Sequence, residues 1–401
     1  MEAANYKQTS VGLIPSDWEV KKLGSLGKII SGLTYSPEDV SGDDGILVLR
    51  SSNVQERQLV FDDNVFVKVE AFNSVQKNDI LICVRNGSKN LIGKNALITQ
   101  EIEGVAFGAF MAIFRSDFNK YLFQIFGTDL YQKEIHKNLG ATINSINGSD
   151  LKEFKIPLPP LPEQEKIAKI LSTWDSAIDE CKTIIENLKL RNKGLSQQLL
   201  SGKMRVKGFE ETKWNNQNLG HVTENFSRRN KSLIDARIYS VTNSNGFVLQ
   251  SDHFSREVAG SDLNNYKIIR RNEFAYNPAR INVGSIAYFS EDIGVISSLY
   301  VCFKTNDLLH DGFLSEWLKL EKTNHDINRY GEGGVRVYLW YDLFKTIKIN
   351  FPDLKEQYAI VNILEKATEE LHHFQQKLEK LQLEKKGLMQ QLLTGKVRVK
   401  I

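Results

Sequence analysis

Two short stretches of the chain have residue types that could do chemistry on a phosphate or a methyl group. Gly87 to Asn95 (GSKNLIGKN) is close to a phosphate-binding loop, but it has one residue too many and ends in Asn where Ser or Thr should hold magnesium. Asn277 to Arg280 begins like a methyl-transfer signature, but Ala279 and Arg280 do not fit its last two positions. Neither stretch predicts a catalytic site.

The remaining catalytic residue types show no usable spacing either. The seven histidines have no metal-ligand pattern, and Cys83, Cys181 and Cys302 are too far apart for a CxxC site. Pro352-Asp353 followed by Lys355-Glu356 could suggest a nuclease, but this stretch leads into a long helical pattern and is better explained as a linker. We therefore predict no catalytic residues and no metal site.

The loops instead carry side chains suited to nucleic acid. Arg and Lys neutralise phosphates, while Arg, Asn and Gln make paired hydrogen bonds to base edges in the major groove. The candidates in the first half are Arg50, Ser51, Asn53, Arg85, Asn86, Ser88, Lys89 and Lys94, and those in the second half are Arg228, Arg229, Lys231, Thr242, Asn243, Arg280, Asn282 and Arg336. The alternative for each is an ordinary polar loop residue.

Two globular regions must position these loops, and we assign them to residues 1–155 and 208–348. Short apolar runs bounded by Gly, Asn and Asp predict strands in both regions. In the first region the runs are Ile46–Leu49, Val65–Val69, Ile80–Val84, Ala96–Thr99 and Ala109–Phe114, and in the second they are Ile238–Val241, Phe247–Leu249, Ile268–Ala275, Ser285–Phe289 and Tyr300–Phe303. Helical spacing predicts helices over Asn119–Leu139 and Asp311–Leu320.

An internal repeat organises the rest of the chain. Residues 156–207 and 349–400 align without a gap at a constant offset (349 − 156 = 193). Their shared residues lie near the two ends, in Leu-x-Glu-Gln and Lys-Gly-Leu-x-Gln-Gln-Leu-Leu. A shorter repeat at Trp18 and Trp214 extends the duplication into both globular regions. Two ungapped copies of this length predict a duplicated architecture.

Each copy has apolar residues at alternating steps of four and three, which is the period of a coiled-coil seam. The seam residues are Ile167, Leu171, Trp174, Ile178, Cys181, Ile185, Leu188, Leu195 and Leu199 in the first copy, and Ile360, Leu364, Ala367, Leu371, Phe374, Leu378, Leu381, Leu388 and Leu392 in the second. One polar residue interrupts each seam at the same place, Asn192 and Lys385. Such a residue either fixes the register or is simply tolerated near a wet end.

The expected fold is therefore α+β, with two globular domains joined by two long helices. Prolines before the first helix and a Gly after each one (Gly202 and Gly395) limit each helix to roughly 38 residues, or about 57 Å. The chain order of domain, helix, domain, helix predicts antiparallel pairing within the molecule. The alternative is that each helix pairs with another protein. The predicted domains are 1–155, 156–207, 208–348 and 349–401.

Composition narrows the class further. The chain has 401 residues, 41% hydrophobic and 25% charged, which is ordinary for a water-soluble globular protein. The net charge of +3 neither favours nor excludes nucleic acid. Three cysteines without a framework, no apolar stretch of about 18 residues and no apolar run near Met1 predict a cytoplasmic protein without a membrane span.

The repeated motifs resemble the specificity subunits of Type I restriction-modification systems. The residues that carry the resemblance are Pro159, Leu161, Glu163, Gln164, Ile167, Ile170 and Leu171, then Lys193 to Val206, their second copies, and the stretch Ile14 to Glu19. The resemblance implies a subunit without catalytic activity. Each domain would be a target recognition domain reading one half of a split, asymmetric DNA sequence, and the paired helices would act as a spacer.

The same resemblance implies the partners. Double-stranded DNA is one. Two modification subunits would dock on the helices and carry the adenine methyltransferase site with S-adenosylmethionine, and restriction subunits would use ATP and magnesium. This chain itself would hold no cofactor. Two other functions stay open from the residues alone: a coiled-coil adaptor that does not read DNA, and a stand-alone DNA-modifying enzyme.

Overall fold

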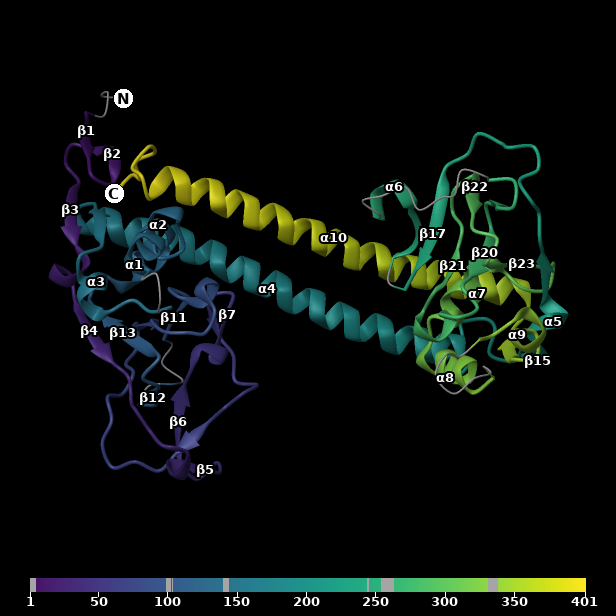
Figure 1. The fold of residues 1–401 in the computed structure, drawn as a ribbon, viewed down its shortest axis with the longest axis horizontal. Helices are drawn as coiled ribbons and strands as arrows, with labels where there is room; N and C mark the ends of the chain where they lie inside the picture. Colours follow the sequence, from purple (N-terminus) through teal and green to yellow (C-terminus); the bar gives the residue numbers. More distant parts are fainter. Residues whose placement is uncertain are drawn as a thin grey trace. The chain divides into compact units, whose positions relative to one another are not determined.

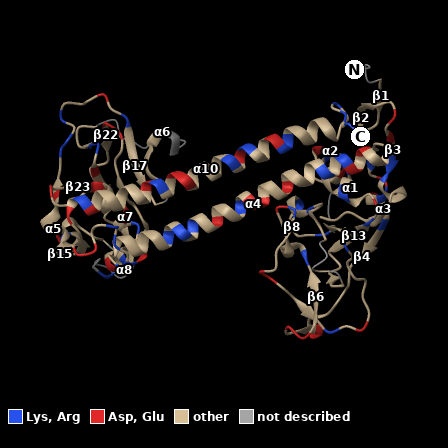
Figure 2. Cartoon of the chain, turned by 180° about the vertical axis from the view of Figure 1, so that it is seen from behind, with Lys and Arg blue, Asp and Glu red and all other residues tan. Residues whose placement is uncertain are grey.

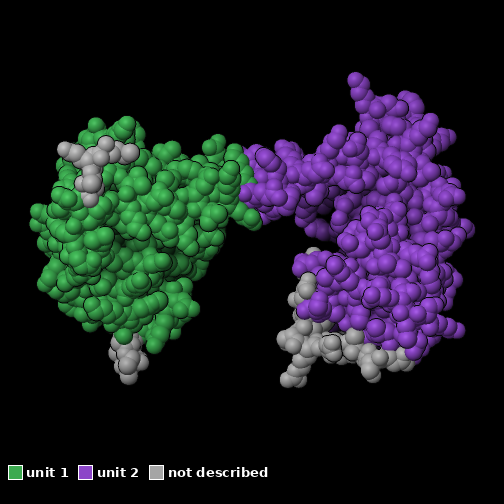
Figure 3. Space-filling model, turned by 90° about the horizontal axis from the view of Figure 1, so that it is seen from above, with its two compact units in different colours: residues 1–182, 377–401 green, residues 183–376 purple. Residues whose placement is uncertain are grey.

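A computed structural model describes residues 5–98, 102, 104–139, 144–243, 245–253, 263–330 and 338–401. The chain divides into two compact units, residues 1–182 with 377–401 and residues 183–376 (Figure 3). The division falls inside both long helices, so each unit contains one globular domain and part of each helix. The predicted α+β architecture is confirmed.

The first domain consists of short strands and three short helices. Its strands are β1 (Tyr6–Thr9), β2 (Gly12–Pro15), β3 (Glu19–Lys22), β4 (Lys28–Ser31), β5 (Val40–Ser41), β6 (Ile46–Leu49), β7 (Val54–Gln55), β8 (Gln58–Leu59), β9 (Phe66–Val67), β10 (Ile80–Cys83), β11 (Asn95–Leu97), β12 (Ala106–Phe107), β13 (Met111–Arg115) and β14 (Lys155–Leu158). Its helices are α1 (Asn119–Ile125), α2 (Asp129–Asn138) and α3 (Gly148–Lys152). The main sheets run β11-β10-β13-β4 and β12-β6-β9-β5.

The second domain repeats this plan. Its strands are β15 (Asn215–Asn218), β16 (Thr223–Phe226), β17 (Ile238–Thr242), β18 (Gly246–Leu249), β19 (Lys267–Arg270), β20 (Glu273–Tyr276), β21 (Ile286–Tyr288), β22 (Ile293–Ile296), β23 (Val301–Thr305) and β24 (Lys348–Phe351). Its helices are α5 (Leu219–Val222), α6 (Gln250–His253), α7 (Asp311–Leu318), α8 (Glu321–Tyr330) and α9 (Tyr341–Phe344). The sheet β16-β23-β20-β21 corresponds to β4-β13-β10-β11 of the first domain.

The central hairpin shows why the sequence folds this way in both domains. Strand β10 is an unbroken apolar run that is buried along its whole length, and β20 is buried in the same way. A polar residue in the left-handed conformation precedes each strand, Asn78 with φ 66° and Asn272 with φ 68°. Asn tolerates this region better than most residues, so it sets the turn before each buried strand.

Two predicted elements are divided in the structure. The helix expected over Asn119–Leu139 is two helices, α1 and α2, because the chain turns at Gly127 between them, where the backbone N–H of Gly127 donates to Gln124 O (3.1 Å). The strand expected over Ile268–Ala275 is also two, β19 and β20, because Asn272 turns the chain. In both cases an apolar run continues across a turn, and apolar spacing alone does not reveal the break.

The long helices are α4 (Leu161–Leu200, 40 residues) and α10 (Leu354–Leu392, 39 residues), and they pack antiparallel as predicted (Figure 1). Gly202 (φ 72°) and Gly395 (φ 69°) adopt the left-handed conformation just past the helix ends, as the sequence indicated. The seam residues of α4 are buried except for Trp174 and Leu195, whereas those of α10 between Leu371 and Leu388 are half-buried. Figure 2 shows charged residues of both signs along the rest of each helix.

A buried ion pair, which we call the end clasp, closes each end of the paired helices. In the first unit Arg398, beyond α10, donates to Glu163 at the start of α4 (2.7 and 2.8 Å). In the second unit Arg205, beyond α4, donates to Glu356 at the start of α10 (2.9 and 2.8 Å). Both carboxylates are buried, and both pairs come from the repeated motifs. The end of one helix is thus bound to the beginning of the other in each unit.

Candidate functional site

The structure brings most of the first-half candidates into one surface group, the first loop cluster (Arg50, Ser51, Arg85, Asn86 and Lys94). The cluster forms where β6 and β10 end and their loops meet. Asn86 Nδ2 donates to Ser51 Oγ (3.0 Å), and Lys94 Nζ donates to Ser51 O (3.2 Å). Ser51 and Asn86, which are 35 positions apart in sequence, therefore belong to one polar surface, because the loops that follow β6 and β10 meet there.

Other contacts hold the loop after β10 in place. Ser88 N donates to Asn86 Oδ1 (3.0 Å), and Asn144 Nδ2 donates to Gly87 O (2.8 Å). Arg85 forms an isolated bridge with Ser145. These bonds occupy mainly backbone groups, and the side chains of Arg85, Ser88 and Lys89 stay exposed. The loop is therefore fixed in shape while its cationic groups face solvent.

Arg50 and Asn53 are also bonded to residues outside the candidate set. Arg50 Nη2 pairs with Asp63 (2.6 Å) at the surface, so a phosphate would have to compete with this carboxylate. Asn53 is fully buried. Its Oδ1 accepts from Arg50 N (2.9 Å) and its Nδ2 donates to Val60 O (3.0 Å). Because its amide stabilises the loop, we leave Asn53 out of the proposed interface.

The second loop cluster consists of Thr242, Asn243, Arg280 and Asn282. The turn after β17 carries the first two residues and lies against the turn after β20, where Gly284 (φ 93°) meets the backbone of Asn243. A Cβ at Gly284 would lie 2.9 Å from Asn243 O, so the approach of these two turns requires glycine. Arg280 and Asn243 are exposed at the surface that results.

Two of the other second-half candidates are engaged elsewhere, one is exposed, and one is not described. Arg228 donates to both carboxylate oxygens of Glu273 (3.1 and 2.9 Å), and this bond raises the pKa of Arg228. Arg229 Nη1 donates to Asn265 Oδ1 (2.9 Å). Lys231 is exposed. Arg336 lies outside the residues that the structure describes.

Arg228 has a structural counterpart that sequence reasoning missed. In the first domain Arg115 donates to both oxygens of the buried Asp79 (2.9 and 2.7 Å), at the turn equivalent to that of Glu273. A buried acid at the start of the central hairpin thus binds an arginine in both domains, although the arginine comes from a different strand. This pattern favours a structural role for Arg228, since a bidentate pair is strong and geometrically specific.

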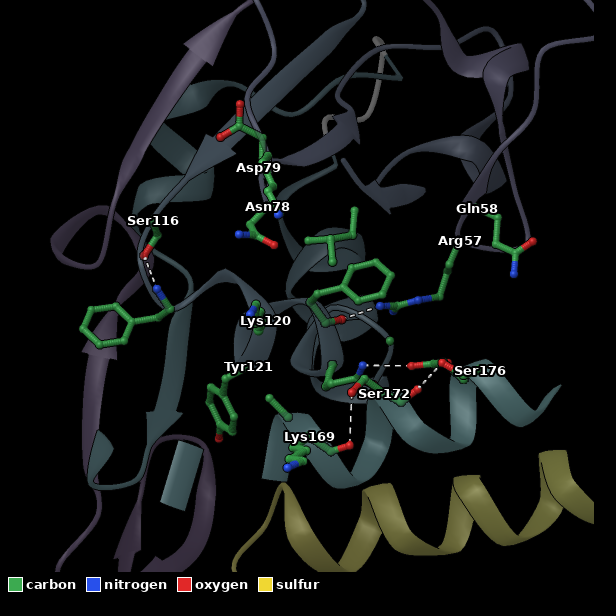
Figure 4. A pocket seen from close by; sticks show the side chains of 18 of the residues that line it. Arg57, Gln58, Asn78, Asp79, Ser116, Lys120, Tyr121, Lys169, Ser172 and Ser176 are labelled. Carbon is green, nitrogen blue, oxygen red and sulfur yellow. Dashed lines mark hydrogen bonds between the residues drawn. The ribbon is translucent and has the colours of Figure 1, made fainter. Parts of the chain in front are cut away.

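A cleft of about 1890 Å³ lies in the first unit between the domain and the long helices. Gln124 Nε2 donates to Asp175 Oδ2 across it (2.9 Å), and Asp175 also pairs with Lys385. Figure 4 shows Arg57 reaching toward α1, where its guanidinium donates to Phe123 O. Burial lowers the pKa of Arg57 to about 10. None of the loop-cluster residues lines this cleft, so it is separate from the candidate nucleic-acid surface.

Metal-binding groups and reactive thiols are two features that the structure allows us to check. Among them, no group of three His, Cys, Asp or Glu side chains could hold a metal ion. The thiols of Cys83, Cys181 and Cys302 are buried, and burial raises the pKa of Cys302 to about 12. A protonated, buried thiol is a poor nucleophile. No helix in the described part of the chain is long and apolar enough to span a membrane.

Comparison with known proteins gives one consistent family. The sequence model for the Type I restriction modification DNA specificity domain matches residues 15–190 and again residues 215–383. The specificity subunit of the Escherichia coli (strain K12) enzyme EcoKI is 28% identical over 318 residues, covering 76% of this chain and 68% of that protein. A putative specificity subunit, MjaX, from Methanocaldococcus jannaschii is 28% identical and covers 99% of this chain and 97% of its own length.

Solved structures agree on the fold. The S subunit of a Type I restriction-modification system from M. genitalium is 17% identical and covers 94% of this chain and 96% of its own, with a TM-score of 0.58. A chain from a structural study of complex assembly and conformational transition in a Type I system has 13% identity, covers 96% of this chain and 99% of its own, and has a TM-score of 0.55. At these identities the likeness concerns the fold alone.

Proposed function

Because the chain belongs to the family of Type I restriction-modification DNA specificity subunits, we propose that its two target recognition domains each read one half of an asymmetric, split DNA sequence. The observation that carries the proposal is that equivalent turns of one repeated fold present two different polar loop clusters. A shared scaffold with different loops suits two half-sites of different sequence.

The chain is the non-catalytic subunit of its system, so the chemistry belongs to its partners. Two modification subunits would supply the adenine methyltransferase site and S-adenosylmethionine. Restriction subunits would supply ATP-dependent translocation and cleavage with magnesium. The loop clusters contain few cations, and the net charge of the chain is +3. The partner subunits would therefore supply further contacts to the DNA phosphates.

The paired helices would set the spacing between the half-sites and dock the modification subunits. A docking role is supported by two leucines at the same place in the repeat (383 − 190 = 193). Leu190 lies on α4 in the second unit and is 70% exposed, and Leu383 lies on α10 in the first unit and is 72% exposed. Neither leucine belongs to the seam. A repeated apolar side chain outside the seam suits two copies of one partner.

The docking proposal can be tested by mass measurement of the assembled complex. Leu383→Glu should remove one modification subunit, Leu190→Glu the other, and the double variant both. Leu13→Glu is a matched control, because Leu13 is exposed but lies on β2. Complexes that keep two modification subunits in the double variant would refute docking at these leucines.

Methylome sequencing of cells with and without the gene tests DNA reading directly. We expect one split methylated motif to disappear when the gene is deleted. Replacing residues 1–155 with the first domain of another family member should change one half of the motif and leave the other half unchanged. An adaptor that does not read DNA would leave the motif intact after the exchange, and this result would contradict the proposal.

A further inference from the structure

We propose that Phe110 in the first domain and Leu299 in the second are specificity-determining residues that contact the 5-methyl group of a thymine in the half-site that each domain reads. This inference rests on the proposed function and adds to it a chemical feature of the target. Neither residue carries a polar group, so a search for phosphate- or base-binding side chains in the sequence does not find them.

The two residues occupy equivalent positions in the repeated fold. Strand β12 pairs in parallel with β6, and β22 pairs in parallel with β17. Phe107 is the last residue of β12 and pairs with Leu49 of β6, and Ile296 is the last residue of β22 and pairs with Tyr239 of β17. Phe110 and Leu299 each follow three residues later, in the short connection to β13 or β23. The fold therefore delivers both side chains to the same point of each domain.

Both side chains are exposed in a short connection between buried residues. Phe110 is 55% exposed and Leu299 is 72% exposed. The strand ends on either side are buried, with Phe107 and Met111 around the first residue and Ile296 and Tyr300 around the second. A single exposed apolar residue needs no explanation. The same exposure at equivalent points of two domains with different sequences suggests a shared use.

The surroundings of Phe110 belong to the first loop cluster. Its carbonyl oxygen accepts from Val84 N (2.9 Å) and Arg85 N (3.1 Å), so the loop after β10 is bonded directly to it. The Arg85 guanidinium lies 5.7 Å from the centroid of the Phe110 ring. An exposed ring thus stands beside an exposed cation that can bind a phosphate or a guanine, which is an arrangement suited to a DNA groove.

Leu299 is linked to the second loop cluster through its neighbour rather than through its own carbonyl. The next residue, Tyr300, accepts at its hydroxyl from Val241 N (3.3 Å), immediately before Thr242 and Asn243. Tyr300 O also accepts from Lys267 Nζ (2.6 Å). These bonds fix the backbone that carries Leu299, so its side chain is presented on a rigid support next to the polar turn.

Thymine is the target that this chemistry selects. Its 5-methyl group is the apolar feature that a base pair presents in the major groove, and apolar side chains such as Phe recognise it there. A groove presents thymine methyl groups between rows of phosphates. An apolar side chain beside a cation, such as Phe110 beside Arg85, can contact both. Because Phe and Leu differ in shape, the two domains would accept thymines in different surroundings, in agreement with two unlike half-sites.

The test uses the complex of the full chain with its modification subunits and a duplex that carries the motif found by methylome sequencing. Each thymine is replaced singly by deoxyuridine, which pairs identically but lacks the methyl group. We expect at least one replacement in each half-site to weaken binding about fourfold, the effect of roughly one buried methyl group. Phe110→Ala should abolish this dependence in one half-site only, and Leu299→Ala in the other only.

Matched controls separate recognition from folding. Phe61→Ala removes another exposed ring of the first domain, and Leu308→Ala removes another exposed leucine of the second. Both controls should keep the full dependence on the methyl groups. The inference is overturned if deoxyuridine never weakens binding of the unaltered complex, if a half-site contains no thymine, or if Phe110→Ala and Leu299→Ala retain the dependence. If deletion of the gene removed no methylated motif, the proposed function itself would be overturned, so the two failures are distinguishable.

Discussion

The first and second units close their helices with the same Glu–Arg pair, but the groups around the pair differ. In the first clasp Trp18 Nε1 also donates to Glu163 (3.0 Å), and Asp17 gives Arg398 a second carboxylate (2.9 and 2.7 Å). In the second clasp Thr212 Oγ1 donates to Glu356 (3.0 Å) instead. The repeat therefore preserves the ion pair, while the flanking residues have diverged.

The tryptophans show the same divergence. Trp18 and Trp214 stand at matching places in the repeat (214 − 18 = 196). The indole N–H of Trp214 is buried without a hydrogen-bond partner among the described residues, and its ring instead lies 5.7 Å from the Arg205 guanidinium. A residue type kept by the repeat thus makes a different contact in each unit.

The polar breaks in the seam differ in kind as well. Asn192 Nδ2 donates to Ala367 O in the second unit (2.7 Å), which is a neutral hydrogen bond. Lys385 pairs with Asp175 in the first unit, and Asp175 also accepts from Gln124 of the domain. Both polar residues therefore link α4 to α10, and the Lys385–Asp175 pair is also bonded to the first domain through Gln124. Substitutions at these contacts, and a change of pH, should affect the two units to different extents.

A charge in the seam should have the largest effect. Leu188 is buried in the second unit, and its counterpart Leu381 is half-buried in the first. Leu188→Asp should lower the free energy of unfolding by about 4 kcal/mol, because it places a carboxylate in an apolar contact. The loss for Leu381→Asp should be about 1–2 kcal/mol smaller than for Leu188→Asp, because Leu381 is only half-buried. Urea unfolding followed by circular dichroism measures both, and equal losses would show that the two halves of the seam are equivalent.

Removing the clasp carboxylates should have the next largest effect. Glu356→Gln leaves the Arg205 guanidinium without its carboxylate partner and should lower the free energy of unfolding by about 3 kcal/mol. Glu163→Gln should cost about 1 kcal/mol less, because Asp17 still pairs with Arg398. The double variant Asp17→Asn with Glu163→Gln should lower the free energy of unfolding as much as Glu356→Gln does. The comparison fails if Glu163→Gln is the more destabilising of the two single variants.

The polar breaks should respond differently to an apolar replacement. Lys385→Met removes the ion-pair partner of Asp175 and should lower the free energy of unfolding by about 1–2 kcal/mol. Asn192→Leu restores an apolar seam and should change the free energy of unfolding by less than about 1 kcal/mol. Both are read from urea unfolding midpoints. A larger loss for Asn192→Leu would show that its hydrogen bond to Ala367 O contributes more than the ion pair.

Acid should weaken the first clasp through Asp17 by a small amount. The hydrogen bond from Arg398 lowers the pKa of Asp17 below its ordinary value of 3.8. A carboxyl group with a lowered pKa in the folded state stabilises it above 3.8, and this contribution is lost as the pH falls through the lowered value. Because Asp17 is half exposed, the contribution should be less than about 1 kcal/mol. Asp17→Asn should remove this part of the acid dependence, whereas Lys213→Asn, at the matching position, should not.

Much of the scaffold was readable from the sequence because it depends on periodicity and duplication. The long helices, their caps at Gly202 and Gly395 and their antiparallel order follow from an apolar period and from the chain order of the segments. The divided elements at Gly127 and Asn272 could not be read in this way, because local turns interrupt apolar runs without changing their pattern.

The sequence predicts residue types for the proposed interface, but it does not predict their arrangement. Sequence composition indicated that Arg85 and Asn86 suit nucleic acid, but it also selected Asn53 and Arg228, whose side chains the structure uses for a loop and an ion pair. Phe110 and Leu299 carry no polar signal and become visible only as matching exposed positions.

The duplicated scaffold follows from the sequence alone, because helical periods, caps and repeats are local properties of each segment. Tertiary structure decided which loops meet, which polar groups are already bonded and which apolar side chains remain exposed. Those properties depend on residues distant in sequence, such as Ser51 with Asn86 or Glu163 with Arg398, which only the pairing of strands and helices brings within bonding distance.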